Sequence, residues 1–409
     1  MRILYVTQIV PYPPHGGVLQ RGFNLLRELG RRHEVHLLAF HHRDELPLGE
    51  AVERSKRELG AFCRTVEYFD LLPKRSAAHR LLCLAVAVLH PEPFSVLAHR
   101  SRQLSRRIAE ICRGNRAPDI VHLDTIALAP YARCCGDRPV ILAHHNIESQ
   151  LMQRRATFER GRLQRVYVGR EASKLRRLEA RVADQFRANI TVSVADAEEL
   201  RTICPRAITE VIPNGVDTTY FVPRRGLETP TLIFTGGMNM FANRDGVDWF
   251  LACAWPSVKA RVPDAQFVAI GQRPSERLQV AAAMSGAVLA PGFVQDVRPA
   301  VARAAIYIVP LRVGGGTRLK VLDAMAQGKA IVSTTLGAEG IDVQNGEHLV
   351  LADDAKAFAD CIVDLLNRPE ERLRLGEAAR NRAEEKYSWA MLGDRLAGVY
   401  ASAIEGGSP

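Results

Sequence analysis

The sequence lacks cysteines at metal-binding spacing. Its eight cysteines form no CxxC pair, Cys134 and Cys135 are adjacent, and no group of histidines and cysteines has the spacing of a zinc site. We therefore expect reduced thiols, as in a cytosolic protein, and no structural metal. The chain also lacks a nucleic-acid recognition module and an RNP-type aromatic pattern, so we expect no nucleic-acid partner.

Long apolar runs are missing as well. The longest one, residues 81–89, is far shorter than the roughly 20 residues of a membrane-spanning helix. The N-terminal segment MRILYVTQIV stops at PYPP and has no small-residue cleavage site, so a buried strand is favoured over a signal peptide. These absences predict a soluble protein, or one that lies on a membrane surface without crossing it.

Positive charge is abundant, but it is regional. The 409-residue chain has a formal net charge of +10. Residues 74–107 hold seven Lys and Arg against one acid, and residues 151–187 hold eleven against four. The rest of the chain is slightly acidic. The basic segments are either solvated helix surface or docking sites for anionic lipid headgroups, and the sequence leaves both readings open.

Alternating short apolar runs and helical patterns recur along the whole chain. The first unit combines a strand at Ile3–Val6, a turn at Gly16–Gly17, a helix around Phe23–Leu29 and a strand at Glu34–Phe40. Further strands are expected at residues 120–123 and 140–143, and then at 210–212, 231–235, 266–270, 287–289, 306–310 and 330–333. This rhythm predicts two doubly wound parallel sheets in tandem, with a boundary near residue 205 and a helical C-terminal tail.

Three glycine-containing turns follow predicted strands. They are Gly16–Gly17, Gly236–Gly237 and Gly314–Gly316. Ligands of doubly wound sheets bind beyond the carboxyl ends of the strands, where helix N-termini attract anions. Each turn alone is equally well explained as a tight connection, but three at corresponding places favour an anionic ligand.

The third turn continues as VGGGTRLKVLDAMAQGKAIVS, residues 313–333. It fits neither the Walker A pattern nor the GxGxxG dinucleotide pattern. Arg318 and Lys320 stand at the start of a predicted helix, where their charge opposes the helix dipole unless an anion binds there. Asp323 lies about one turn deeper. It is placed to bind ribose hydroxyls, or it simply pairs with Lys320.

Together these segments resemble glycosyltransferase family 4, the retaining nucleotide-sugar glycosyltransferases of GT-B fold. The likeness spans nearly the whole chain. It rests on PYPPHGGVLQRGFNLLRELGRRHEVHLL, SVADAEEL, VIPNGVDTTYFVP, IFTGGMNMFANRDG, FVAIGQRP, GFVQDVRP and GGGTRLKVLDAMAQGKAIVST. A subgroup linked to bacterial exopolysaccharide synthesis is most similar, on PLRVGGGTRLKVLDAMAQG and EKYSWAML.

The resemblance implies two Rossmann-like domains that face a central cleft. Residues 1–205 would form the acceptor domain and residues 206–386 the donor domain, with the tail 387–409 packed back on the first. Many members carry two acids eight positions apart, but here Asp323 is preceded at that distance by Gly315. The resemblance therefore assigns Asp323 to the ribose, and leaves the other acid's place to the backbone amides of Gly315, Gly316 and Thr317.

The resemblance also suggests further site residues. Arg244 is retained near a position that contacts the donor diphosphate, but Asp245 stands where a lysine is frequent, so we expect Arg318 and Lys320 to take over. His145 in HHNIES matches a histidine over the donor sugar, and Glu148 is a weaker candidate on the acceptor side. The backbone near Val294 would contact a uracil or guanine base. Gly16, Gly17, Gly236 and Gly237 would line the donor site.

No DxD-like pair for a bridging metal stands out, so we expect no metal or other cofactor. The expected activity is retaining transfer of a sugar from a nucleotide-diphosphate sugar to a lipid-linked or glycan acceptor. The expected location is the cytoplasm, with docking on the inner membrane face through 74–107 and 151–187. A nucleotide-sugar epimerase and a catalytically inert nucleotide-sugar binder remain as alternatives.

Overall fold

The computed structural model describes the chain except for residues 15, 72–78, 80–89, 160, 225, 227, 314–317 and 407–409. Its contacts divide the chain into two units. The N-terminal unit comprises Met1–Asn214 together with the residues from Leu392 onward, and the C-terminal unit comprises Gly215–Met391.

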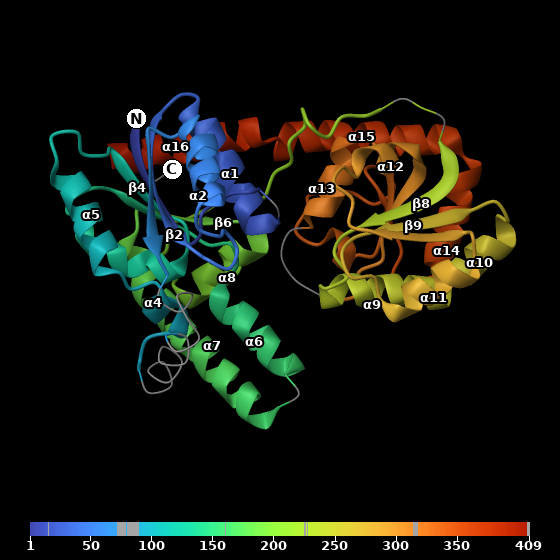
Figure 1. Cartoon of the computed structure of the whole chain (residues 1–409), viewed down its shortest axis with the longest axis horizontal. Coiled ribbons are helices and arrows are strands. Elements are labelled where there is room, and N and C mark those ends of the chain that lie inside the picture. Colours follow the sequence, from blue (N-terminus) through green and yellow to red (C-terminus); the bar gives the residue numbers. More distant parts are fainter. Residues whose placement is uncertain are drawn as a thin grey trace. The chain divides into compact units, whose positions relative to one another are not determined.

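The N-terminal unit is built on a parallel sheet of seven strands in the order β3-β2-β1-β4-β5-β6-β7 (Figure 1). The inner strands of the sheet are short, mostly apolar runs that are buried on both faces, as parallel strands covered by helices require. The two edge strands are mostly half-buried. The strands are β1 (Arg2–Thr7), β2 (Glu34–His41), β3 (Thr65–Asp70), β4 (Ile120–Leu123), β5 (Val140–Ala143), β6 (Ala188–Thr191) and β7 (Thr209–Val211).

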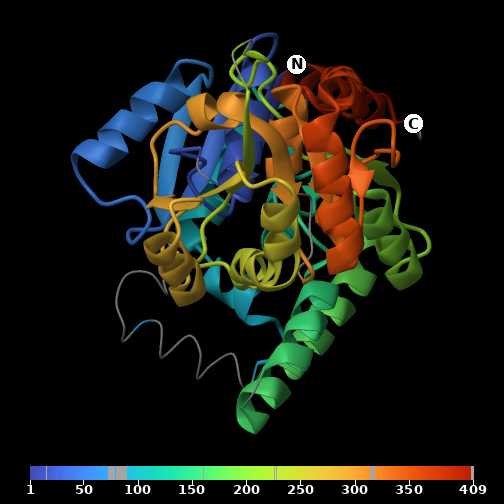
Figure 2. The ribbon, with the colours of Figure 1, turned by 90° about the vertical axis from the view of Figure 1, so that its right-hand side faces the viewer.

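Helices connect these strands and cover the sheet. They are α1 (Gly17–Gly30), α2 (Glu50–Gly60), α4 (Phe94–Ala98), α5 (Arg102–Arg113), the 3-10 helix η2 (Ile126–Cys134), α6 (Glu148–Phe158), α7 (Arg162–Val182), the short η3 (Ala183–Gln185) and α8 (Val194–Ile203). Helices α6 and α7 lie side by side as a hairpin that extends away from the sheet, as Figures 1 and 2 show.

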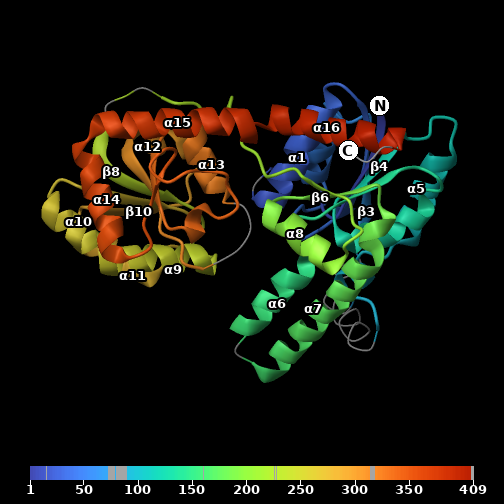
Figure 3. The same cartoon turned by 180° about the vertical axis from the view of Figure 1, so that it is seen from behind.

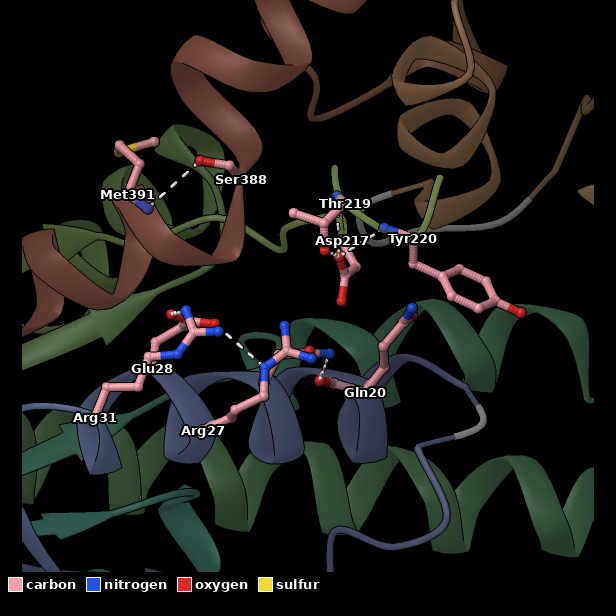
Figure 4. A network of polar contacts seen from close by, with 10 residues as sticks. Gln20, Arg27, Glu28, Arg31, Asp217, Thr219, Tyr220, Ser388 and Met391 are labelled. Carbon is pink, nitrogen blue, oxygen red and sulfur yellow. Dashed lines mark hydrogen bonds and ion pairs between the residues drawn. The ribbon is translucent and has the colours of Figure 1, made fainter. Parts of the chain in front are cut away.

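The last helix, α16 (Trp389–Glu405), packs on α1 of the N-terminal unit from Leu392 onward. The two helices meet at Gly393, where an added Cβ would lie 2.5 Å from the Cβ of Glu28. The Glu28 carboxylate is held by Arg27 at 3.2 Å and by Arg31 (Figure 4). Arg32 of the same region forms an ion pair with Asp394. Glycine is therefore required at 393 for this close helix contact.

The C-terminal unit has a second parallel sheet, with six strands in the order β10-β9-β8-β11-β12-β13. These are β8 (Thr229–Thr235), β9 (Gln266–Ile270), β10 (Val288–Gly292), β11 (Ala304–Val309), β12 (Ala330–Ser333) and β13 (Val350–Leu351). The two sheets confirm the expected α/β fold class with two Rossmann-like, doubly wound domains.

Helices cover both faces of the second sheet, as Figure 3 shows from behind. One face carries α9 (Phe241–Trp249), the π-helical segment η4 (Phe250–Ala254), α10 (Trp255–Arg261), α11 (Glu276–Met284) and α14 (Ala355–Asn367). The other carries α12 (Arg298–Arg303), α13 (Leu319–Ala326) and α15 (Pro369–Tyr387). The short 3-10 helix η5 (Leu336–Ala338) follows β12.

The boundary between the units differs from the expected one near residue 205. The run at 210–212 was expected to open the second sheet, but β7 pairs in parallel with β6 of the first sheet. The division consequently falls after Asn214, within the PNGVD segment. Just beyond it, the carboxylate of Asp217 accepts hydrogen bonds from the amides of Thr219 and Tyr220 at 3.1 and 3.0 Å, which fixes the turn (Figure 4).

Candidate functional site

In the C-terminal unit, the turn after β8 contains Gly236 and Gly237. The amide of Gly236 donates to the carbonyl of Ile270 at 2.8 Å, so it is engaged within the sheet. Because Gly236 has no side chain, it leaves room for two neighbouring side chains. A Cβ atom there would lie 2.6 Å from the Nζ of Lys320 and 2.9 Å from the Nδ2 of Asn243. The turn is thus shaped around side chains that come from α9 and α13.

Lys320 stands in the first turn of α13 and reaches across to this glycine turn. Its Nζ donates to the Oδ1 of Asn243 at 2.6 Å and lies 4.0 Å from the ring centroid of Phe234. The amide of Asn243 in turn donates to the carbonyl of Gly237 at 2.9 Å. Burial lowers the pKa of Lys320 to about 7, and the charge of Arg318 adds to the shift. The negative charge of an anion bound beside Lys320 would raise the pKa of Lys320 again.

Asp323 lies one helical turn further along α13 and is only partly exposed. Burial raises the pKa of Asp323 to about 7, although the positive charge of Lys320 opposes the shift. Its charge also contributes to the raised pKa of the buried Tyr307. The Lys320 ammonium bonds to Asn243 rather than to Asp323. The alternative of a simple Lys320–Asp323 ion pair is therefore not favoured.

Arg318 precedes α13, and its side chain is mostly buried. Its Nε donates to the carbonyl of Leu336 at 3.4 Å, and its Nη2 lies 3.9 Å from the carboxylate of Glu339. Burial lowers the pKa of Arg318, and Glu339 opposes the shift. Arg318 lies close enough to Lys320 to lower that residue's pKa. The expected ligands Gly315, Gly316 and Thr317 lie outside the described residues.

Arg244 does not join this cluster. Its side chain is exposed, and its guanidinium lies 5.9 Å from the ring of Phe241. Asp245, which stands where a lysine is frequent in the family, makes two hydrogen bonds with Arg312 at 2.8 and 3.1 Å. Arg312 follows β11, so the guanidinium beside Asp245 comes from the end of a neighbouring strand. Sequence reasoning missed both Asn243 and Arg312, because nothing local shows that Asn243, in the first turn of α9, meets Lys320 or that Arg312 meets Asp245.

Val294, the expected base contact, lies in the loop after β10 and packs against the core of the C-terminal unit. In the N-terminal unit, Gly16 precedes α1 with a φ of 91°, and an added Cβ would meet nothing within 4 Å. Gly17 is the first residue of α1. Gly16 and Gly17 thus form an exposed turn beside open space, unlike Gly236.

The two adjacent histidines after β5 have different surroundings. The Nε2 of His144 lies 3.1 Å from the side-chain oxygen of Asn189, and burial lowers the pKa of His144 to about 4. The Nε2 of His145 instead lies 3.2 Å from a carboxylate oxygen of Asp124, which directly follows β4. His145 and Asp124 therefore meet at the carboxyl edge of the sheet, where ligands of such folds bind.

Glu148 begins α6, next to this pair. Burial raises the pKa of Glu148, and His145 opposes the shift. Sequence reasoning missed Asp124, although a carboxylate directly after the buried run Ile120–Leu123 was a usable signal.

Elsewhere in the described chain, ligand atoms of His42, Asp44 and Glu45 lie within 4.8 Å of one another near the end of β2. None of these three residues contributes to the clusters around Lys320 or His145.

The α6–α7 hairpin carries exposed apolar and basic side chains together. Leu163 and Val166 are 88% and 62% exposed, and Leu151 is also exposed. Among the described residues, no carboxylate lies within ion-pair distance of the exposed Arg154, Arg162, Arg170 and Arg177. No helix in the described part of the chain has the length and apolarity to cross a membrane. Much of the other basic segment, 74–107, lies outside the described residues.

Two protein-family models match the chain. The model described as Glycosyltransferase Family 4 matches residues 15–220, and the model described as Glycosyl transferases group 1 matches residues 229–368. The first match covers just over half of the 409 residues. The two matches correspond closely to the two units of the structure.

Several curated proteins are similar in sequence. A phosphatidyl-myo-inositol mannosyltransferase of Mycolicibacterium smegmatis is 30% identical over 203 residues, which are 46% of this chain and 50% of that protein. An uncharacterized 44.6 kDa protein in the cps region of Klebsiella pneumoniae is 25% identical and covers 89% of this chain and 90% of its own. The chain thus spans about half the length of the mannosyltransferase that it matches.

Solved structures share the fold. Anabaena HepE in complex with UDP superposes with a TM-score of 0.66 at 14% identity, and covers 98% of this chain and 100% of its own. Sucrose-phosphate synthase from Thermosynechococcus elongatus also gives a TM-score of 0.66, at 16% identity, and covers 99% of this chain and 100% of its own. The combination of two such sheets in one chain is therefore found in other solved structures.

Proposed function

The chain belongs to glycosyltransferase family 4, and on this premise we propose that it is a retaining glycosyltransferase. It would move a sugar from a nucleotide-diphosphate sugar to a lipid-linked or oligosaccharide acceptor in the synthesis of a cell-surface glycan. The observation that carries this proposal is the position of the half-buried Lys320 beside the Gly236 turn, with the half-buried Asp323 one turn deeper on α13. The similar mannosyltransferase and cps-region protein support the substrate class.

In this proposal, residues of the C-terminal unit bind the donor. Lys320, with Arg318 nearby, neutralises the diphosphate. Asp323 accepts hydrogen bonds from the ribose hydroxyls. Asn243 holds Lys320 in place at 2.6 Å and frees it when the phosphate arrives. The pKa of Lys320, lowered to about 7 by burial, rises again once the diphosphate supplies a counter-charge.

The reaction breaks the bond between the sugar C1 and the diphosphate. The main task of the protein is then to stabilise negative charge on the leaving phosphate. Fixed cations can do so without a metal, and Lys320 and Arg318, with Arg312 beside Asp245, are the candidates. The acceptor hydroxyl attacks from the face that the diphosphate leaves and gives its proton to the leaving phosphate. No carboxylate nucleophile is needed, which suits a donor site whose single acid is Asp323.

In the N-terminal unit, His145 would contact the donor sugar, and Glu148 would face the acceptor. Both lie at the carboxyl edge of the first sheet, and His145 is positioned by its contact with Asp124 at 3.2 Å. The α6–α7 hairpin would place the protein on the inner face of a membrane that contains anionic lipids. Its exposed Leu163 and Val166 support this docking, together with exposed arginines for which the described residues supply no ion-pair partner.

A donor panel tests the proposal. Purified protein is incubated with UDP- and GDP-sugars and a lipid extract as acceptor, and released nucleoside diphosphate is measured. We expect release with one donor class, loss of release in Asp323→Ala, and no change in the control Asp360→Ala, a partly exposed acid on α14 that pairs with Arg261 and Lys356. Donor binding without release would indicate the inert binder, and a changed donor sugar would indicate the epimerase.

A further inference from the structure

A set of buried polar side chains lies directly behind His145. The carboxylate of Asp124 is 3.2 Å from His145 Nε2 through one oxygen, and 3.4 Å from the Tyr5 hydroxyl through the other. The Tyr5 ring stacks on His122 with a centroid distance of 4.1 Å. His122 is joined to Tyr400 by a hydrogen bond of 2.8 Å. The set thus combines β1, β4, the turn after β5 and the C-terminal helix α16.

Asp124 is an ionised carboxylate in the interior. It is 2% exposed, and burial alone would raise its pKa, but His145 and His122 outweigh burial and hold the pKa of Asp124 well below its usual range. Arg21 of α1 also faces this set; it is 3% exposed and donates to the carbonyl of Pro213 at 2.8 Å. A buried charge of this kind is costly unless it is paired, which calls for a specific role.

His145 depends on this carboxylate. Apart from its contact with Asp124, the Nε2 atom of His145 has no hydrogen-bond partner among the described residues. The 3.2 Å contact is not aligned as a hydrogen bond, and such contacts at reactive sites often tighten only when substrate binds. When the imidazole is neutral, Asp124 favours the tautomer with its proton on Nε2, which leaves Nδ1 as an acceptor.

We propose that Asp124 is a positioning residue that fixes the orientation and tautomer of His145, and that α16 supports it through Tyr400 and His122. This inference rests on the proposed role of His145 in sugar transfer. Tyr400 is 276 residues from Asp124 in sequence, so the C-terminal helix becomes part of the support for the N-terminal half of the site rather than a simple cover.

A double-mutant cycle tests whether Asp124 acts through His145. We compare kcat and KM for nucleoside diphosphate release in Asp124→Asn, His145→Ala and the double variant. We expect Asp124→Asn to lower kcat about tenfold or more with a donor KM within about twofold, and to have less than about a twofold effect in the His145→Ala background. Equal losses in both backgrounds would overturn the proposal. Full activity of His145→Ala would instead overturn the role of His145 itself.

NMR of His145 requires no turnover. It therefore distinguishes a failure of the positioning by Asp124 from a failure of the proposed role of His145 in sugar transfer. In protein labelled with 15N-histidine, the ring nitrogens of His145 report its tautomer by NMR. We expect Asp124→Asn to change the tautomer populations, Tyr400→Phe to change them in the same direction but less, and Asp119→Asn to leave them unchanged. Asp119 precedes the same strand and binds the backbone amide of Arg2 at 2.7 Å. His145 signals that are identical in wild type and Asp124→Asn would contradict positioning.

Discussion

The ammonium of Lys320 bonds to Asn243 at 2.6 Å in the space that Gly236 leaves by having no side chain. The glycine turn after β8 and the basic start of α13 are therefore one structure and not two separate anion sites. Lys320 arrives from the neighbouring strand's helix, because β8 and β11 are adjacent in the sheet. The hydrogen bond to Asn243 explains why a lysine is tolerated at the positive end of a helix.

Gly236→Ala should damage donor binding more than folding. The added Cβ would lie 2.6 Å from Lys320 Nζ, the mobile end of a long side chain, so Lys320 is displaced. The φ of 149° at Gly236 also strains any residue with a Cβ, so we expect some loss of stability as well. Gly271→Ala should instead unfold the C-terminal unit, because its Cβ would lie 2.0 Å from the backbone oxygen of Gly236. Calorimetric titration with UDP and GDP, combined with thermal melts, separates the two effects. Gly169→Ala, with nothing within 4 Å, is the matched control.

Lys320→Met should weaken nucleoside diphosphate binding and raise stability. Losing a charge on the phosphate site should reduce affinity for the diphosphate about tenfold or more, and affinity for the nucleoside much less. Burial of an ammonium is costly, as its lowered pKa indicates, so the variant should melt at a higher temperature at pH 6. The exposed Lys356→Met is the control. A lower melting temperature for Lys320→Met would contradict the burial cost.

The stabilising effect of Lys320→Met should depend on pH. Burial lowers the pKa of Lys320 to about 7 in the folded protein, below its ordinary value of 10.5, which holds in the unfolded chain. The folded state therefore binds fewer protons between these values, and wild-type stability rises with pH through this window. The advantage of the variant should be largest below pH 7 and shrink towards pH 10. Melting curves at pH 6, 8 and 9.5 check this trend.

Diphosphate binding should be strongest near pH 7. Above that pH, Lys320 loses its charge before binding, and affinity falls as pH rises. Below it, Asp323, with its pKa raised to about 7, becomes protonated and loses an acceptor for the ribose. The two groups titrate as a coupled pair, so the profile reports both. Titrations between pH 5.5 and 9 should show the alkaline limb flattened in Lys320→Met and the acid limb flattened in Asp323→Asn.

The fold was largely predictable from the sequence, and the site only in part. Runs such as Gln266–Ile270 and Ala330–Ser333 become β9 and β12 with the predicted bounds, because buried parallel strands are continuous apolar runs. The run at 210–212, predicted to open the second sheet, instead falls in β7 of the first sheet. Nothing local distinguishes the last strand of one unit from the first strand of the next. Glycine turns and a basic helix start marked Lys320 and Asp323 as candidates.

The residues that sequence reasoning missed depend on strand order. Asp124 meets Tyr5 because β1 and β4 are neighbours, although 119 residues separate them. Asn243 meets Lys320 across 77 residues, and Arg312 meets Asp245 across 67. No periodicity or local motif encodes such pairs. They follow from the topology, which becomes known only when the sheet is assembled.

Arg380 should be essential for the stability of the C-terminal unit. Its guanidinium, on α15, donates to the carbonyls of Thr218 and Phe221 and to that of Ala326 at the end of α13. Arg380→Met leaves these carbonyls without a donor, which should cost about 2–4 kcal/mol of unfolding free energy. Urea unfolding measures the loss. Arg303→Met, an exposed arginine on α12, should change stability by less than about 0.5 kcal/mol.

The α6–α7 hairpin should bind anionic membranes through apolar and basic contacts together. Leu163→Glu with Val166→Glu removes the exposed apolar contacts and adds negative charge, so co-sedimentation with vesicles of anionic lipid should be lost. Arg162→Gln with Arg170→Gln should weaken binding and reduce its salt dependence, since each cation contributes about 1 kcal/mol near such a surface. Val280→Glu, an exposed apolar residue on α11, is the control. Equal binding of wild-type protein to neutral and anionic vesicles would contradict electrostatic docking and leave the hairpin a solvated surface.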